Sequence, residues 1–328
     1  MRLAVAFWLA AATVLGSGAV RAQSNAPADG RTACTLEPGP TRAVTGVPDG
    51  ETIVLDDGSE VRLVGALAPR APDSALDLAH WPPERDAKAA LEKLVLGRSV
   101  TLGFAGRRND RYGRTLAHAF VAPEVGGEMQ WVQAQMLAGG HARAYVLRDS
   151  PGCLRELVAH EAIARTAATG LWSHAAYHLR DAARTAELMR LRSTFQIVED
   201  EVTAVIEGKT ALVLRFGPGD ADRKAEPAGE RPETREPPGF SLAIKPAVAR
   251  AWAAADGLAL DQTLGRRLRI RGWIERRGGP AIDIIDPQQI ELVDGGAHLV
   301  SSAAPLPEPR RRSRRSRREP AATPASAP

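Results

Sequence analysis

With 328 residues, the chain is long enough for two domains of ordinary size, each with its own hydrophobic core. Its formal net charge is +4, but positive charge gathers at the two ends: residues 1–22 carry +2 and residues 300–328 carry +5, which leaves −3 for residues 23–299. A net negative charge on residues 23–299 excludes a folded region that binds polyanions over its whole surface. Affinity for nucleic acid therefore has to come from local patches or from the tail.

Residues 1–22 are typical of a secretory signal peptide. Arg2 precedes an apolar run at 4–15, and small residues ending at Ala22 precede Gln23. The run is short for a membrane span, and no later segment offers about 18 uninterrupted apolar residues. We therefore expect an exported protein, periplasmic or secreted, with no membrane span; an uncleaved N-terminal anchor is the alternative.

The two cysteines are Cys34 and Cys153. An oxidising compartment would permit a disulfide between them, but spacing alone leaves a bridge and two free thiols equally open. Two cysteines without clustered histidines also disfavour a zinc site.

Residues 32–180 predict an α+β domain built on a small OB-like β-barrel with three helices. Short alternating segments bounded by turn residues predict strands at 43–47, 52–55, 61–64, 99–104 and 116–121. Helical spacing of apolar residues predicts helices at 84–95, 131–137 and 153–169, each followed by glycine. This order of strands and helices favours a closed barrel flanked by helices.

Residues 192–296 predict a second small, mainly-β barrel of the OB type. Strands are expected at 195–206, 210–216, 240–244, 267–275 and 281–285, with one helix at 247–255. We interpret 181–191 as a linker, 217–238 as a flexible insertion between strands, and the Arg/Ser- and Ala/Pro-rich tail at 300–328 as disordered.

Motifs in the first domain resemble the staphylococcal-nuclease (thermonuclease) family in order and spacing. They are Asp49-Gly50-Glu51-Thr52, then Val61-Arg62-Leu63-Val64-Gly65 leading to Ala68-Pro69, then Asp110-Arg111-Tyr112-Gly113-Arg114, and finally Gly170-Leu171-Trp172. The resemblance covers roughly residues 40–175. It implies a fold on which phosphodiesters are hydrolysed with the help of calcium, with two arginines stabilising the phosphate and a glutamate activating water.

Carried over to this chain, the resemblance assigns the two catalytic arginine positions to Arg62 and Arg114. Guanidinium groups suit this role because they form paired hydrogen bonds with phosphate oxygens, where negative charge accumulates. Glu51 stands at a calcium-ligand position, and Tyr112 and Tyr145 stand where the family places rings near the nucleotide. The alternatives are that Arg62 pairs with a nearby carboxylate, that Arg114 is a solvated turn residue, and that the tyrosines belong to the core or rim.

The chain departs from the family at two positions of the next motif. Leu67 stands where the second calcium ligand belongs, and Arg70 replaces the glutamate. Leucine offers no oxygen to a hard cation, and an arginine stays protonated and cannot act as a general base. Calcium binding is therefore expected to be weak or absent, unless Asp73 or Asp77 supplies a substitute carboxylate.

In the second domain, the strand at 267–275 alternates basic and apolar residues. Arg267, Arg269, Arg271 and Trp273 share one face, an arrangement that suits a groove for single-stranded nucleic acid, although an ordinary solvent-facing strand has the same pattern. The arginine-rich tail would attract any polyanion.

The sequence therefore favours an exported protein that binds nucleic acid or nucleotide phosphates on a nuclease scaffold, with hydrolysis weak or lost. The first alternative is an active metal-dependent nuclease with a rearranged site. The second is a structural envelope protein whose barrels mediate protein contacts. Oligomeric state stays open.

Overall fold

The computed structural model describes residues 34–70, 82–123, 126–148, 153–217 and 239–293. The predicted signal peptide, positions 218–238 of the predicted insertion, and the predicted tail lie outside these ranges, as do Asp73 and Asp77.

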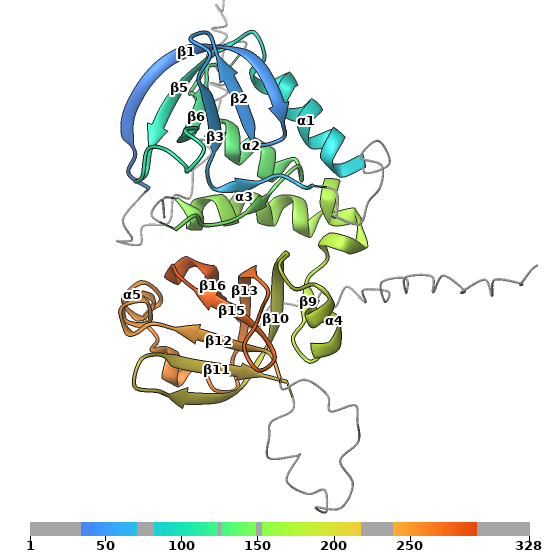
Figure 1. Ribbon diagram of the computed structural model, residues 1–328, viewed down its shortest axis with the longest axis vertical. Helices are drawn as coiled ribbons and strands as arrows, with labels where there is room; N and C mark the ends of the chain where they lie inside the picture. Colours follow the sequence, from blue (N-terminus) through green and yellow to red (C-terminus); the bar gives the residue numbers. More distant parts are fainter. Residues whose placement is uncertain (1–33, 71–81, 124–125, 149–152, 218–238, 294–328) are drawn as a thin grey trace, which may run out of the picture. The chain divides into compact units, whose positions relative to one another are not determined.

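Five strands of the first domain close into a barrel (Figure 1). They are β1 (Glu37–Asp49), β2 (Thr52–Leu55), β3 (Glu60–Leu63), β5 (Ser99–Phe104) and β6 (Thr115–Val121). The long β1 pairs antiparallel with both β2 and β5, and a parallel pairing of β3 with β6 closes the ring. Alternation along the strands turns Val44, Ile53 and Val61 into the core. The predicted small barrel is confirmed.

Three helices flank this barrel: α1 (Pro82–Val95), α2 (Val132–Ala138) and α3 (Leu154–Thr166). Ala87, Leu91 and Val95 form the buried face of α1, as their spacing predicts. Smaller elements complete the domain: β7 (Gln130–Trp131) extends the sheet beside β6, β4 (Ala66–Leu67) pairs with β8 (Arg143–Ala144), and two short 3-10 helices follow, η2 (Gly170–Ser173) and η3 (Ala175–Tyr177).

The second domain is mainly β, as predicted. Its strands are β9 (Arg180–Asp181), β10 (Phe195–Glu207), β11 (Leu212–Phe216), β12 (Ser241–Ile244), β13 (Arg267–Trp273), β14 (Glu275–Arg276), β15 (Pro280–Ile284) and β16 (Ile290–Leu292). The long β10 pairs with β13 along its first half and with β11 along its second, so one strand serves both parts of the sheet. Helix α5 (Pro246–Asp256) buries Trp252 in the same core, and η4 (Leu260–Gln262) follows it.

The segment at 181–191, interpreted as a linker, is part of the second domain's packing. It contains the end of β9, which pairs parallel with β10, and the helix α4 (Thr185–Arg190). Ala182 and Leu188 are fully buried in the second core. A six-residue helix with three apolar positions is too short to show a period, so the sequence pattern does not reveal it.

The described residues of the two domains fall within one compact unit and contact each other directly. A third apolar cluster joins side chains of both domains: Leu67, Tyr145, Ala164, Leu171, Trp172, Tyr177, Phe195 and Ile197. Beside it, the Arg271 guanidinium of β13 lies 3.0 Å from the Glu161 carboxylate of α3, and both side chains are fully buried. The domains are therefore held together by an apolar and an ionic contact.

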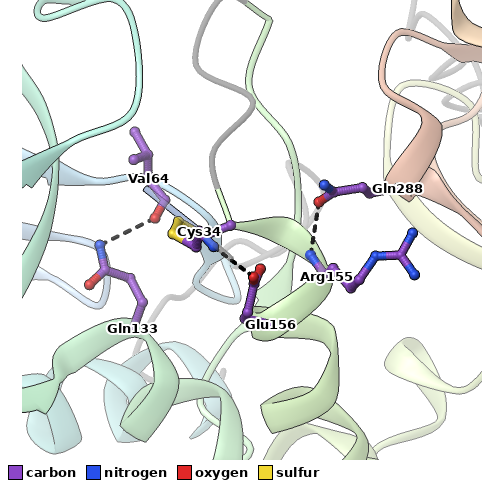
Figure 2. The surroundings of a disulfide bond; sticks show 7 residues. Cys34, Val64, Gln133, Arg155, Glu156 and Gln288 are labelled. Atoms are coloured by element: carbon purple, nitrogen blue, oxygen red, sulfur yellow. Dashed lines mark hydrogen bonds between the residues drawn. A yellow bond between two sulfur atoms is a disulfide. The ribbon is translucent and has the colours of Figure 1, made fainter. Parts of the chain in front are cut away.

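Cys34 and Cys153 form a disulfide at the start of α3, with their Cα atoms 4.9 Å apart (Figure 2). The backbone N–H of Cys34 also donates a hydrogen bond to Glu156 Oε1 at 3.0 Å. On the same turn of α3, the N–H of Arg155 donates to Oε1 of Gln288, from the 3-10 helix η5 (Pro287–Gln289), at 2.9 Å. The start of α3 therefore meets both the N-terminal segment and the second domain. No helix of the described ranges is long and apolar enough to span a membrane.

Candidate functional site

One pocket brings together most of the residues that the family resemblance singled out: Glu51, Arg62, Tyr112 and Arg114. Its volume is about 570 Å³, and it is lined by Glu51, Glu60, Arg62, Leu67, Arg70, Arg111, Tyr112, Arg114 and Trp273. The barrel contributes most of the wall through β3, β4 and the turns before β2 and β6. The end of β13, from the second domain, contributes Trp273. Four guanidinium groups face two carboxylates, so the lining carries a net charge of +2.

Arg62 extends from β3, where its backbone pairs with Thr52 of β2, immediately after Glu51. Its Nη2 atom lies 3.4 Å from Oε1 of Glu51. Its Nε atom is fully buried, and the buried Tyr145 hydroxyl lies close enough to Arg62 for a hydrogen bond between them to lower the pKa of Tyr145. The Arg62 side chain as a whole remains 21% exposed, so the exposed part of the guanidinium is what a ligand can reach. Glu60, two residues earlier, lies on the same side of the strand.

Arg70 forms the closest contact with Glu51. Its Nη2 atom lies 2.6 Å from Oε1 of Glu51 and 3.6 Å from Oδ2 of Asp49. Partial burial pushes the pKa of Arg70 down, but the charge and hydrogen bond of Glu51 more than offset this, so the pKa is raised. The other Glu51 oxygen, Oε2, accepts a hydrogen bond from the N–H of Ala68 at 3.1 Å. The Glu51 carboxylate, 1% exposed, is thus engaged on both oxygens by the protein itself.

The turn between β5 and β6 presents Arg111, Tyr112 and Arg114 to the pocket. Asp110 organises it: one carboxylate oxygen accepts the backbone N–H groups of Tyr112 and Arg114, and the other accepts Nε of Arg114 at 2.8 Å. These bonds lower the pKa of Asp110, although burial acts in the opposite direction. Gly113 has φ +85°, which an L side chain adopts only with strain. The Arg114 guanidinium is therefore held by its inner edge, and its outer N–H groups remain for a ligand.

The two tyrosines differ in their placement. Tyr112 is 73% exposed and lines the pocket, within cation–π distance of Arg111 and Arg114. Tyr145 is buried in the apolar cluster between the domains. Burial raises the pKa of its hydroxyl to about 12, despite the opposing charge of nearby Arg62. Tyr112 is available for stacking, whereas Tyr145 is buried and is not available for it.

The described residues do not fit a calcium ion at the position that the family resemblance implies. Calcium requires about six to eight oxygen ligands. Here the Glu51 oxygens are taken by a guanidinium and a backbone N–H, and Leu67 is buried among apolar side chains. Within the described ranges, no group of three or more His, Cys, Asp or Glu side chains is placed to hold a metal. Arg70 supplies the positive charge beside Glu51 that an ion would otherwise provide.

The basic residues of β13 are placed differently from the groove that their alternation predicts. Arg269 lies 2.8 Å from Glu199 and also pairs with Glu291, Arg267 pairs with Glu199, and Arg271 is fully buried between Glu161 and Glu291. Burial opposes the charge of Arg271, but the two glutamates raise its pKa above the ordinary value. The first domain covers the middle of this strand face. Of the four predicted residues, Trp273 reaches the pocket.

Three charged pocket residues received no binding role from the sequence: Glu60, Arg70 and Arg111. Glu60 and Arg111 were detectable in principle, because Glu60 is two residues from Arg62 on a strand and Arg111 lies within the turn motif. At position 70, the sequence shows that an arginine replaces the glutamate of the family. It does not predict the ion pair of Arg70 with Glu51, because that pair depends on the path of the chain after β4.

Comparison with known protein families supports the resemblance of the first domain to the staphylococcal-nuclease family. The family model described as "Staphylococcal nuclease homologue" matches residues 60–174, from β3 to the turns after α3. A comparison with curated proteins found no match. The matched residues cover Arg62, Arg70 and Arg114, whereas Trp273 lies outside them. The chain thus contains a staphylococcal-nuclease-like domain, joined to a second, mainly-β domain.

Proposed function

We propose that the arginine pocket binds the phosphate groups of a nucleic acid or nucleotide without a divalent metal, and that phosphodiester hydrolysis is weak or lost. The observation that carries this proposal is the ion pair between Arg70 and Glu51. It occupies the carboxylate that would bind the metal, and it places a permanently protonated group where the family has its general base.

The phosphate-binding half of the site supports the same proposal. Arg62 is held beside Glu51 with part of its side chain exposed, and Arg114 is fixed by Asp110 so that its outer edge remains available. Fixed guanidinium groups in a partly enclosed pocket bind a phosphate more strongly than flexible surface lysines do, because little side-chain freedom is lost on binding. Both arginines line the same pocket, and Arg70 stands where the resemblance implies the glutamate that activates water.

The test is binding and cleavage of fluorescently labelled single-stranded DNA and RNA by the mature protein. In EDTA, we expect binding that weakens with salt and falls at least tenfold in the Arg62→Ala/Arg114→Ala variant. The matched control is Arg42→Ala/Arg85→Ala, which removes the same charge from exposed positions outside the pocket and should bind like the parent protein. Calcium-dependent cleavage that the pocket variant abolishes would overturn the proposal and favour the active nuclease.

We also propose that the protein is exported. The disulfide between Cys34 and Cys153 supports this, because such bonds persist in oxidising compartments. Mass spectrometry of the protein recovered from the cell envelope or medium should find a chain that begins at Gln23 and contains no free thiol. An intact N-terminus with reduced cysteines would contradict export.

A further inference from the structure

The second domain contributes an aromatic wall to the arginine pocket. Trp273, at the end of β13, is 49% exposed and lines the pocket. Its ring adds a flat apolar surface to a lining that also contains guanidinium groups. Among the described residues, the large exposed apolar side chains include two aromatic ones, Tyr112 and Trp273, and both line this pocket. A half-exposed tryptophan beside arginines is a surface on which a planar ring can stack.

The Trp273 ring is held in place. It packs edge-on against Phe195, with ring centroids 5.9 Å apart and planes at 75°. Phe195 is the strand partner of Trp273 in the β10–β13 pairing and packs in turn on Tyr145 of the first domain, at 6.4 Å. Because the ring is already oriented, a ligand that stacks on it loses little further conformational freedom on the protein's side.

Leu67, one of the two positions at which the chain departs from the family pattern, lies in the same pocket as Trp273. The side chain that replaces a calcium ligand lines the pocket and belongs to the same buried cluster as Tyr145 and Phe195. The position therefore contributes an apolar side chain to a cluster shared by both domains, in place of an oxygen ligand. The pocket lining combines flat or apolar groups with guanidinium groups that bind an anion.

We propose that the pocket binds an unpaired nucleotide unit, whose phosphate lies against Arg62 and Arg114 and whose base stacks on Trp273. This rests on the proposed function, and it specifies that both domains form the binding site. A volume of about 570 Å³ lies within the range of small-molecule sites. In a duplex the bases are stacked on one another and are not free to stack on a side chain, so the site selects single strands or free nucleotides.

The experiment compares a thymidine oligonucleotide with an abasic oligomer that has the same number of phosphates. Both are titrated in EDTA into the mature protein and into Trp273→Ala, Trp273→Phe and Leu264→Ala. Leu264, an exposed apolar residue of the second domain that does not line the pocket, is the control. We expect Trp273→Ala to weaken binding of the base-containing oligomer by about 10- to 100-fold, to leave the abasic oligomer unchanged, and Trp273→Phe to restore most of the loss. Thermal unfolding of each variant checks that it is folded.

The outcomes separate this inference from the proposed function. If the Arg62→Ala/Arg114→Ala variant loses both oligomers while Trp273→Ala binds both like the parent, the phosphate site stands and the stacking wall is overturned. If the parent protein binds neither oligomer, both proposals fail. A duplex of the same length that binds as tightly as the single strand would also overturn the selectivity stated here. A mononucleotide that competes with the oligomer would identify a free nucleotide as a sufficient ligand.

Discussion

At the scale of single residues, the character of the site depends on Arg70. Its guanidinium forms the closer ion pair with the buried Glu51 carboxylate, at 2.6 Å. Arg62 lies farther from the same oxygen, at 3.4 Å. Without Arg70, the negative charge of Glu51 would be compensated mainly by Arg62 and would repel an incoming phosphate. The sequence shows that a general base is missing at position 70. It does not show that the replacement forms an ion pair inside the pocket.

Replacing Arg70 by Gln should therefore weaken binding of single-stranded nucleic acid and reduce its salt dependence. For single strands, the slope of log affinity against log salt becomes shallower by about 0.7 for every phosphate that the protein no longer neutralises. Anisotropy titrations at several salt concentrations measure this slope. Arg85→Gln, on α1 and 70% exposed, is the matched control with an unchanged slope. An unchanged slope in Arg70→Gln would show that Arg70 takes no part in binding.

At the scale of secondary structure, the sequence predicts most elements because each has a local cause. The strand at 99–104 is observed at the predicted limits, and α1 begins two residues earlier than predicted. Where the structure differs from these predictions, the cause is a contact between segments that are distant in the sequence. Residues 181–191 are ordered by burial of Ala182 and Leu188, and the alternating pattern of β13 does not show that α3 covers the position of Arg271. Alternation identifies two faces of a strand, but it does not say which of them meets another part of the chain.

One buried group on β6 makes stability depend on pH. His118 is fully buried, its ring nitrogens have no hydrogen-bond partner among the described residues, and it packs against Trp131. Burial lowers its pKa from 6.5 to about 4, so the native state keeps it neutral where the unfolded chain binds a proton. Stability is therefore lost as pH falls from 6.5 towards 4, by about 2 kcal/mol at pH 5.

Replacing His118 by Leu should remove this part of the acid sensitivity. Urea unfolding at pH 7 and pH 5 gives the loss of free energy for each protein, and the loss should be about 2 kcal/mol smaller in His118→Leu. Comparing each protein with itself cancels the cost of the changed side chain. Equal losses in the two proteins would mean that His118 does not remain neutral in the native state.

At the scale of the whole molecule, the two domains share a buried network of charges. Arg271 donates to Glu161 and to the backbone oxygen of Ala144, both in the first domain, and pairs with Glu291 in its own. Such a network fixes how the domains meet, because each charge is stabilised by the partners that the other domain supplies. It also sets the position of Trp273, two residues along the same strand. The sequence could not reveal this, since the partners lie more than 100 residues apart.

Replacing Arg271 by Met should lower the free energy of unfolding by about 3 kcal/mol, because Glu161 stays buried and keeps, among the described residues, one ion-pair partner, Arg165. Adding Glu161→Gln should recover part of this loss, which a double-mutant cycle in urea measures. If Arg271→Met is as stable as the parent protein, the charge pair does not hold the domains together. The matched exposed control is Arg277→Met, with no effect expected.

We propose that the phosphate site works without a divalent metal because Arg70 takes the place of the ion beside Glu51. The most direct test is the affinity of the mature protein for a single-stranded oligonucleotide in EDTA and in millimolar calcium at constant ionic strength. We predict the same affinity in both, and an intact oligonucleotide at the end of each titration. Binding that requires calcium, or cleavage that appears when calcium is added, would contradict it.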